Sequence, residues 1–412
     1  MKKINRNIKL AYLFESLQSF GSGVWMGNIL SLYIVLFSEK ANGIFGLTSN
    51  ELVGVSAGIT GIAMTAIVFP AGILADKIRR DIILKFSGIL GIMAMLILAL
   101  SSNIIFIMIA LFLWGAFQGF ARPAFEAIIA DSLPTGNRSG TYSTIHLVRQ
   151  FSLSAGPILN ILLFLLLGDD WNIEILRTVM TIGVSISLIS AIVLFFFKDE
   201  NTIGDESESI IEIDDNTEIN KREKWIPILL VMSNVIIGTG AGMTVKFFPV
   251  FFRAIYHLKP VSVQLIMAFT FILTGLAGII AQKLSLRKGR GQAIFFVQIS
   301  ATICLVLIAF YPPLVLLVPL FILRGSLMNA AQPLSRSILM DIVPKRNRGK
   351  WNSLETIAWG LFWNASAVIG GFLIGDNNFK RCFLITAGIY VIATIPILII
   401  IPMIRKEIGH KN

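Results

Sequence analysis

Long apolar runs separated by short polar breaks occupy most of the 412 residues. A membrane-spanning α-helix needs about 20 mostly apolar residues. Runs of this kind lie near residues 10–37, 51–76, 82–100, 104–131, 141–168 and 176–197, and again near 225–253, 262–284, 291–310, 314–341, 350–375 and 380–404. The pattern therefore predicts an all-α membrane protein with twelve transmembrane helices.

One polar segment divides these runs into two sets of six. Residues 198–224, KDENTIGDESESIIEIDDNTEINKREK, hold ten of the 24 acidic residues. A segment of this composition cannot bury enough apolar surface to fold by itself. We predict a largely disordered linker, a spacer rather than a regulatory element, between an N-terminal half, residues 1–197, and a C-terminal half, residues 225–412.

The composition and the charge distribution agree with a bilayer protein. Charged residues make up 14% of the chain and the mean hydropathy is +0.78, whereas soluble domains carry about 25% charged residues. The net charge of +11 does not indicate nucleic acid binding, because the basic residues cluster at the ends of the apolar runs. They crowd the termini and one set of loops, and the opposite loops hold only Lys40, Arg177, Arg253, Lys259, Lys380 and Arg381. The positive-inside rule therefore places both termini in the cytoplasm, at the cell membrane.

The sequence carries no signature of cofactor chemistry. Cys304 and Cys382 lie within apolar runs and indicate no disulfide framework, and the three scattered histidines indicate no metal site. No Gly-x4-Gly-Lys-Ser/Thr loop is present. We therefore expect no cofactor and no enzymatic activity.

The chain repeats itself at a fixed offset that carries Gly115 onto Gly325. GAFQGFARPAFEAIIADSLPTGNRSGTYS, from Gly115, matches GSLMNAAQPLSRSILMDIVPKRNRGKWNS, from Gly325, without a gap. Six helices separate the copies, so both have the same orientation in the membrane, as in the parallel repeats of secondary transporters. A weaker copy pairs AGILADK, from Ala71, with AGIIAQK, from Ala277.

The first of these weaker segments lies in a motif. Residues 72–80 read Gly-Ile-Leu-Ala-Asp-Lys-Ile-Arg-Arg. With the helix count, the linker and the repeat, they resemble the Gly-x-Leu-Ala-Asp-Arg-x-Gly-Arg-Arg signature after helix two of the major facilitator superfamily. The family's second glycine is Arg79 here, so the local turn is expected to differ. The resemblance covers nearly the whole chain and implies a two-lobed secondary transporter that works by alternating access.

The resemblance also implies a latch between the cytoplasmic ends of the two halves. Its residues are Gly72, Asp76, Lys77, Arg79, Arg80, Asp131 and the repeat equivalent of Asp131, Asp341. We expect Asp76 to meet the start of helix eleven near Lys350, where backbone N–H groups and the helix dipole stabilise a carboxylate. Arg79 or Arg80 is expected to reach Asp131, and these contacts would exist only while the cytoplasmic side is closed. The alternative, that the bases merely fix the topology, does not explain Asp76.

Eight ionisable residues interrupt the spanning helices, and each costs roughly 2.5–3.5 kcal/mol on insertion scales. They are Glu15, Arg122, Glu126, Arg149, Lys246, Arg324, Arg336 and Glu355. Arg122 and Glu126 share one helix face, and Arg149 lies at a depth close to that of Glu126. Arg336 is the repeat equivalent of Glu126, and Glu355 lies near its depth. One interpretation is two buried ion pairs that hold neighbouring helices; the other is a substrate or proton site.

The resemblance assigns part of this set to a central cavity. Helices one, four, seven and ten line it in the family, which brings in Glu15, Arg122, Lys246 and Arg324. We place Arg324 near mid-membrane and Lys246 in the outer third, where snorkelling explains it. The excess of bases favours an anionic or zwitterionic substrate. Seven aromatic residues could also line the cavity, although helix packing explains any one of them: Trp25, Trp114, Phe117, Phe247, Phe248, Trp359 and Trp363.

Antiporters of the family often carry a Gly-Pro centred motif on helix five. Here Gly156 and Pro157 are present, but Asn160 stands where a further glycine is typical. Helix eleven carries Asn364 and Ser366 before Gly370-Gly371, and small residues let helices pack closely. The family's helix-four arginine is replaced by Gly115, which argues against a standard drug-antiport proton relay.

We therefore expect a monomeric secondary active transporter whose partners are a small-molecule substrate, protons and the lipid bilayer. Proton-coupled efflux of a small amphiphile is the leading hypothesis. The alternatives are uptake of an organic anion or other polar solute, and, on the same scaffold, a lipid flippase or a transport-dead receptor.

Overall fold

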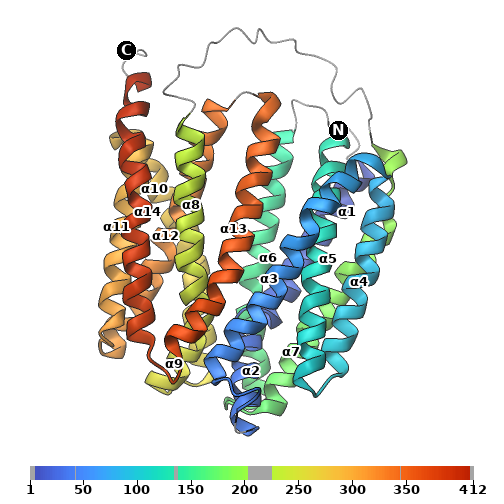
Figure 1. Cartoon of the computed structure of the whole chain (residues 1–412), viewed down its shortest axis with the longest axis vertical. Helices are drawn as coiled ribbons and strands as arrows, with labels where there is room; N and C mark the ends of the chain where they lie inside the picture. The colour runs from blue at the N-terminus through green and yellow to red at the C-terminus, as the bar shows by residue number, and fades with distance from the viewer. Residues whose placement is uncertain (1–4, 42, 134–137, 203–224, 344, 409–412) are drawn as a thin grey trace. The chain divides into compact units, whose positions relative to one another are not determined.

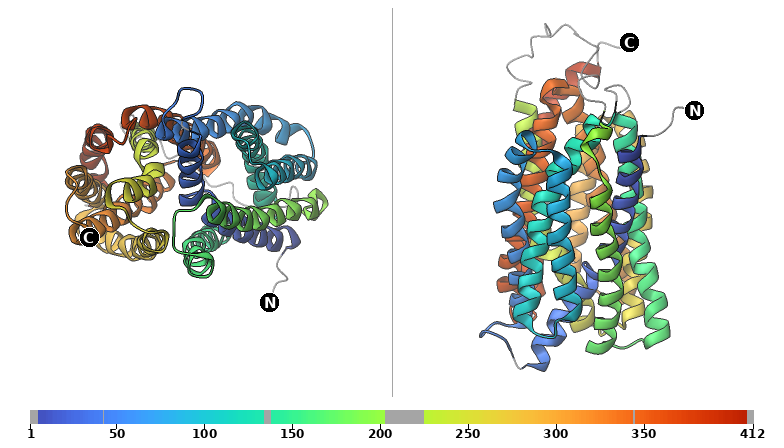
Figure 2. Two further views of the ribbon diagram at one scale, coloured as in Figure 1. Left: turned by 90° about the horizontal axis from the view of Figure 1, so that it is seen from below. Right: turned by 90° about the vertical axis from the view of Figure 1, so that its right-hand side faces the viewer.

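The computed structural model describes residues 5–41, 43–133, 138–202, 225–343 and 345–408. Within these ranges it describes the backbone alone of residues 76, 138–140, 143, 146, 340, 341, 345–350, 352, 353, 355–358 and 405–408. Most of the segment predicted to be a linker, residues 203–224, lies outside the described residues. The chain divides into two compact units, each made of helices that run nearly parallel to one another (Figures 1 and 2).

Unit 1 consists of residues Met1–Ile213 and Lys259–Gln264. Its helices are α1 (Arg6–Trp25), α2 (Asn28–Lys40), α3 (Ser49–Lys77), α4 (Arg80–Leu100), α5 (Ile104–Asp131), α6 (Arg138–Leu167) and α7 (Ile173–Val193), followed by the 3-10 turns η2 (Leu194–Phe196) and η3 (Asp199–Asn201). The closest packing joins α3 and α4 to α5, and α6 and α7 to α1.

Unit 2 consists of residues Asp214–Leu258 and Leu265–Asn412. Its helices are α8 (Trp225–Thr244), the 3-10 turn η5 (Val245–Phe247), α9 (Phe248–Tyr256), α10 (Pro260–Lys288, whose first residues group with unit 1), α11 (Arg290–Ala309), α12 (Leu314–Ile342), α13 (Lys345–Ile374) and α14 (Phe379–Ile408). The closest packing joins α13 and α14 to α8, and α12 and α14 to α11.

The helices have the lengths and surfaces of membrane spans. In the described part of the chain, eleven segments are long and apolar enough to cross a bilayer, and α13 adds the shorter apolar stretch Trp359–Ile374. The outer face of α4 illustrates the lipid-facing surface, because its exposed residues recur every three or four positions. They are Phe86, Ile89, Met93, Leu96 and Leu100. The predicted fold class, an all-α membrane protein with this helix arrangement, is confirmed.

Two spans are interrupted at related positions. The first span breaks between α1 and α2 at Met26 and Gly27, and the seventh breaks at η5, between α8 and α9. Both breaks start 20 residues into the span. At the first break Asn160 of α6 donates from Nδ2 to the Val24 carbonyl at 3.0 Å, which satisfies an acceptor that the ending helix leaves free. This contact gives Asn160 a role that its sequence position did not reveal.

The sequence repeat is visible in the packing. Helices α5 and α12 begin at Ile104 and Leu314, which are related by the same offset as Gly115 and Gly325. A Cβ added at Gly115 would overlap the carbonyl of Thr60, and one added at Gly325 would lie 2.8 Å from Cγ2 of Thr270. The same offset relates Thr60 to Thr270. In each unit, an equivalent glycine therefore allows close contact with an equivalent threonine.

The weaker repeat is out of register with the helices. Helices α3 and α10 are both 29 residues long, so aligning their first residues also aligns their last. This register pairs Ala71 with Gln282, whereas the sequence comparison paired it with Ala277, more than one helical turn earlier. The structural counterpart of the α3–α4 connection is therefore the stretch around Gly289, between α10 and α11, and not the segment from Ala277.

Candidate functional site

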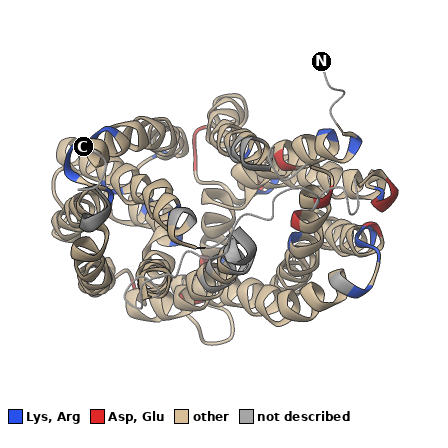
Figure 3. Ribbon diagram, turned by 90° about the horizontal axis from the view of Figure 1, so that it is seen from above, with Lys and Arg blue, Asp and Glu red and all other residues tan. Residues whose placement is uncertain are grey.

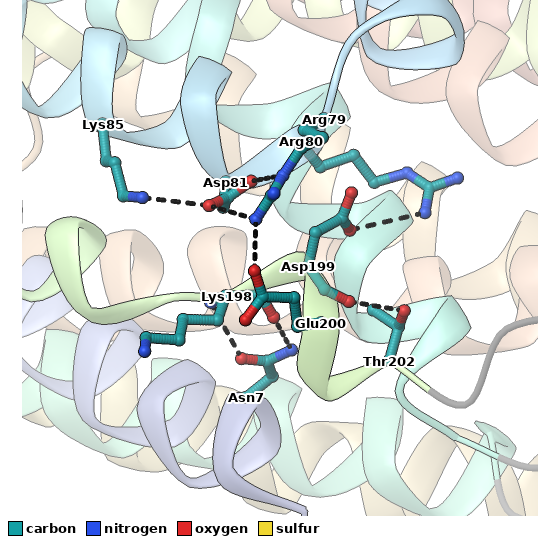
Figure 4. Close-up of polar contacts among 9 residues, drawn as sticks. All are labelled: Asn7, Arg79, Arg80, Asp81, Lys85, Lys198, Asp199, Glu200 and Thr202. Atoms are coloured by element: carbon teal, nitrogen blue, oxygen red, sulfur yellow. Dashed lines mark hydrogen bonds and ion pairs between the residues drawn. The ribbon is translucent and has the colours of Figure 1, made fainter.

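Charged residues gather where α3 ends and α4 begins, at the end of unit 1 that carries the N terminus (Figure 3). Arg79 donates to the Asp81 carboxylate from Nε at 3.1 Å, and Lys85 donates to it from Nζ at 2.9 Å (Figure 4). Asp81 is only 2% exposed, so these two cations offset the cost of removing its charge from water. Arg79 also reaches Glu200 at 3.2 Å, and its hydrogen bonds with Asp81 and Glu200 raise the pKa of Arg79.

Arg80 makes the contact that the resemblance implied. Its Nη1 forms an ion pair with Asp131 Oδ2 at the end of α5, and lies 3.8 Å from Asp199 Oδ1 in η3. The prediction that Arg79 or Arg80 reaches Asp131 is thus confirmed for Arg80. Arg80 and Asp131 belong to the same unit, and the expectation that their contact exists only while the cytoplasmic side is closed stays a prediction.

The rest of the motif is placed only in part. A Cβ added at Gly72 would meet no atom within 4 Å, so no close approach requires glycine there. Lys77 is an exposed residue in the last turn of α3. The side chains of Asp76 and Asp341 lie outside the described residues. The contact of Asp76 with the start of the eleventh predicted span, which is α13 in the structure, therefore stays a prediction.

The first residues of the predicted linker pack against unit 1. Asn7 Nδ2 donates to the Lys198 carbonyl at 2.9 Å, and the Lys198 N–H donates back to Asn7 Oδ1 at 3.4 Å (Figure 4). Thr202 closes the η3 turn by donating to the Asp199 carbonyl at 2.7 Å. Residues 198–202 therefore form part of the ordered unit, although the sequence placed them in the linker. The available signal was the acidic pair Asp199 and Glu200, which directly follows the sixth predicted span and can pair with the basic residues of the motif.

A second group of charges, here called the acid–base layer, comes from α1, α5 and α6. It comprises Glu15, Arg122, Glu126 and Arg149. Arg122 lies among the other three, because it has charge interactions with each of them. Adjacent residues bring the helices together: the rings of Phe14 and Phe125 have centroids 5.0 Å apart, and Ser16 Oγ lies 3.1 Å from Ser152 Oγ. With two acids and two bases, the formal charges of the layer balance.

Glycine-to-glycine contact sets the spacing of α1 and α6 beside this layer. A Cβ added at Gly156 would overlap the backbone of Gly23, and one added at Gly23 would lie 2.5 Å from the Leu153 carbonyl oxygen. Pro157 follows inside α6 and is also buried. The Gly156-Pro157 pair therefore acts in helix packing, as its small residue predicted.

The acid–base layer is not buried. Glu126 and Arg149 are exposed, while Glu15 and Arg122 are partly buried. An exposed side chain on a spanning helix faces either lipid or a water-filled space, so the interpretation of Glu126 and Arg149 as a pair that holds neighbouring helices stays a prediction. A carboxylate that faces a water-filled space can exchange protons, so a proton or substrate site is also compatible with the layer.

In unit 2, Lys246 lies in η5, the turn that interrupts the seventh span. Its Nζ donates to Asn364 Oδ1 of α13 at 2.7 Å, and Asn364 Nδ2 donates to the Gly360 carbonyl at 2.9 Å. Lys246 stands ten residues before Tyr256, the end of α9, which is about 15 Å at 1.5 Å per residue. The seventh span runs from Trp225 to Tyr256, with its midpoint between Gly240 and Ala241. Lys246 lies beyond that midpoint toward Tyr256, and its placement in the outer third stays a prediction.

Arg324 of α12 is the most deeply buried of the candidate cations, at 4% exposure. Its Nη2 donates to the Tyr390 hydroxyl at 2.9 Å, its Cζ lies 5.0 Å from the ring centroid of Phe248, and its Nε has no hydrogen-bond partner. Among the described side chains, no carboxylate forms an ion pair with Arg324 or Lys246. Arg336 is exposed and the side chain of Glu355 lies outside the described residues, so the pairing of these two residues stays a prediction.

The structure separates the candidate aromatic residues into two groups. Five are packing residues, each at most 1% exposed: Trp25, Trp114, Phe117, Phe247 and Phe248. Trp359 and Trp363 are partly exposed, and their rings stack on α13 with centroids 5.6 Å apart and an interplanar angle of 27°. Only this pair keeps ring surface available to another molecule.

Comparison with known proteins places these features in a family. The sequence matches the model of the Major Facilitator Superfamily over residues 12–232 and again over residues 230–412. The chain belongs to the Major Facilitator Superfamily. As a member of this superfamily it is an integral multi-pass membrane transporter and not an enzyme. No curated protein matches the sequence.

Solved structures of other transporters share the fold. The nucleoside transporter NupG is 14% identical, with a TM-score of 0.68 over 95% of this chain and 98% of its own. A bacterial homolog to the human lysosomal transporter Spinster is 15% identical, with a TM-score of 0.72 over 98% and 99%. A POT family transporter in complex with 5-aminolevulinic acid is 12% identical, with a TM-score of 0.72 over 97% and 96%. At these identities the likeness concerns the fold alone.

Proposed function

We propose that the protein is a proton-coupled secondary transporter of a small organic solute, with the acid–base layer of unit 1 as its coupling site. The observation that carries this proposal is the convergence of Glu15, Arg122, Glu126 and Arg149 from three helices on a surface that is not buried. We further infer that both termini lie in the cytoplasm, on the basis of the distribution of basic residues. We infer a monomer in the cell membrane because transporters of this family are usually monomeric.

The chemistry of the layer suits a proton carrier. Each ionisable residue in a spanning helix is costly, so it marks a functional site by default. When Glu126 takes up a proton, the layer changes from balanced charge to an excess of one positive charge. A site whose charge depends on one proton can bind a solute with different strength in its two states, and a ligand shifts a conformational equilibrium only through such a difference.

The proposal is tested with purified protein in liposomes. The solute is the compound from a metabolite and drug panel that most raises the melting temperature of the wild type. A pH gradient should drive its accumulation, and the orientation of the productive gradient separates efflux from uptake. Glu126→Gln should lose gradient-driven accumulation by at least about tenfold while keeping solute exchange, because only the protonatable group is gone.

The matched control is Glu174→Gln, which removes an exposed carboxylate on the first turn of α7, outside the layer. It should transport like the wild type. Recovery of accumulation in the double variant Glu126→Gln/Arg149→Gln would show a structural pair and contradict the proposal. Binding without flux would make the protein a receptor, and transbilayer movement of a labelled phospholipid in place of the solute would make it a flippase.

A further inference from the structure

The polar side chains beside the break in the seventh span of unit 2 form a group that proton coupling does not use. We call it the Lys246 site, made of Lys246, Asn364, Trp359 and Trp363. Lys246, Asn364 and Arg324 each stand ten residues from the helix end on the same side of unit 2, namely Tyr256, Ile374 and Leu314. All three therefore lie at about the same depth, roughly 15 Å from that side.

The local backbone positions Lys246 and keeps it there. Thr244 ends α8 with φ −121°, and residues 245–247 continue as a 3-10 turn. Such a turn inside a span often marks a functional position. Helix α8 meets α13 very closely, since a Cβ at Gly242 would overlap the Trp363 carbonyl and one at Gly238 would lie 3.2 Å from the Trp359 ring. The Lys246 amine, the Asn364 amide and the Trp359 indole therefore lie along the contact between α8 and α13.

Among the described side chains, the Lys246 amine is held by a neutral partner alone. An ammonium group has three donors, and one of them is used on the neutral Asn364 Oδ1. Asn364 is oriented by its own bond to the Gly360 carbonyl, so its oxygen faces the amine. In the part of the chain that the structure describes, no acidic side chain pairs with Lys246. Two donors of a partly exposed cation thus remain for a ligand.

A second cation strengthens the positive field at the same depth. The guanidinium carbon of Arg324 lies 5.0 Å from the ring centroid of Phe248, and Phe248 follows Lys246 by two residues in the chain. Its guanidinium is bonded to the neutral Tyr390 hydroxyl, and its Nε is unpartnered and buried. Charge in a poorly hydrated site acts over longer range than in water. An anion at Lys246 would therefore be stabilised by two cations, one in contact and one behind the aromatic layer.

We propose that the Lys246 site binds the acidic group of a small organic anion that also carries a planar ring, with the acidic oxygens on Lys246 Nζ and the ring against Trp359 and Trp363. The inference rests on the proposed transport function and names its substrate class. Stacked, partly exposed indoles offer a face to a planar ring, and the Lys246 amine selects against a neutral analogue, which would leave its charge unpaired.

The test is a binding measurement that needs no gradient, made on the full-length protein in phosphatidylcholine nanodiscs. The probe panel consists of aromatic carboxylates headed by indole-3-acetate, each beside its uncharged amide, with acetate as the ringless control. At least one carboxylate should quench tryptophan fluorescence and bind at least tenfold more tightly than its amide and than acetate. Lys246→Met should lose that preference, whereas Lys283→Met, an exposed lysine on α10, should keep it.

A second variant covers the case in which Lys246→Met fails to fold. Asn364→Asp supplies an internal carboxylate to the Lys246 amine, so it should abolish carboxylate binding while the melting temperature stays equal to or above that of the wild type. No carboxylate preference in the wild type, or an unchanged preference in Asn364→Asp, would overturn the inference. Competition by phosphatidylglycerol would also overturn it, because the occupant would then be a lipid headgroup.

These outcomes are separable from those of the proposed function. Carboxylate binding without proton-driven flux keeps the Lys246 site and rejects the coupling proposal. Proton-driven flux of a neutral amphiphile without carboxylate preference does the reverse.

Discussion

The two units carry their intramembrane charges in different ways. In unit 1 the acid–base layer joins acids and bases from α1, α5 and α6, on side chains that are exposed or partly buried. In unit 2 the described candidates are cations held by neutral partners: Lys246 by the Asn364 amide and Arg324 by the Tyr390 hydroxyl and an aromatic ring.

This difference separates two kinds of chemistry on one repeated scaffold. A layer with its own acids can change charge by taking up a proton, whereas a group of cations without acids calls for an anion from outside. The repeat makes the contrast sharper, because Arg336 occupies the position of Glu126 in the second copy. The shared packing, through Gly115 and Gly325, is kept while the chemistry diverges.

The largest expected effect tests whether the first and seventh spans have the same orientation. Lys40→Cys, after the first span, and Lys259→Cys, after the seventh, should both react with an impermeant thiol reagent in intact cells. Lys288→Cys, at the end of α10, should react only after permeabilisation. All three positions are exposed, and the native Cys304 and Cys382 are buried, so background labelling should be low. Opposite behaviour of Lys40→Cys and Lys259→Cys would end the comparison of the units as parallel repeats.

The next effect tests the packing beneath the acid–base layer. Gly156→Ala should lower the free energy of unfolding by about 1–3 kcal/mol, because its methyl group would overlap the Gly23 backbone. The measurement is the fall in melting temperature. The control Gly278→Ala lies on α10, where a Cβ meets nothing within 4 Å. It should leave stability unchanged or raise it, since alanine is the better helix former. Equal losses in the two variants would show that the close approach of α1 and α6 is not limiting.

A smaller effect compares the two charge arrangements directly. Arg122→Met leaves Glu15 and Glu126 without the base among them, so stability should fall by about 0.5–1 kcal/mol, a value reduced by their exposure. Adding Glu126→Gln to that variant should recover much of the loss. Arg324→Met leaves no described acid uncompensated, so its melting temperature should stay close to that of the wild type. A large loss in Arg324→Met would identify Arg324 as a structural cation and weaken the contrast.

The smallest effects concern the ion pairs at the cytoplasmic motif. The side chains of Arg80 and Asp131 are 27% and 28% exposed, and those of Arg79 and Glu200 are 51% and 69% exposed. Asp131→Asn should therefore cost up to about 1 kcal/mol, and Glu200→Gln only a few tenths. Thermal unfolding in 1 M salt should abolish the loss of stability in Glu200→Gln and retain part of the loss in Asp131→Asn. The reason is that salt screens the more exposed charges more effectively.

Much of the architecture was predictable because it depends on the order of residues along the chain. Spans follow from apolar length, and the start of α5 and α12 follows from the gapless repeat at Gly115 and Gly325. The contact of a motif arginine with Asp131 followed from the resemblance, but its assignment to Arg80 did not, since Arg79 and Arg80 are adjacent and only the entry into α4 decides which one faces α5.

The number, length and repeat of the helices therefore follow from the order of the amino acids, because hydrophobicity and spacing are properties of neighbouring residues. The surroundings of each charge follow from the packing of the helices. This packing exposed Glu126 and Arg149, buried Arg324 against Phe248, and brought Asn364 to Lys246 across 118 residues of chain. Side chains from other helices decide whether a charge is hydrated, paired with another side chain or available to a ligand. Those side chains come together only when the helices pack.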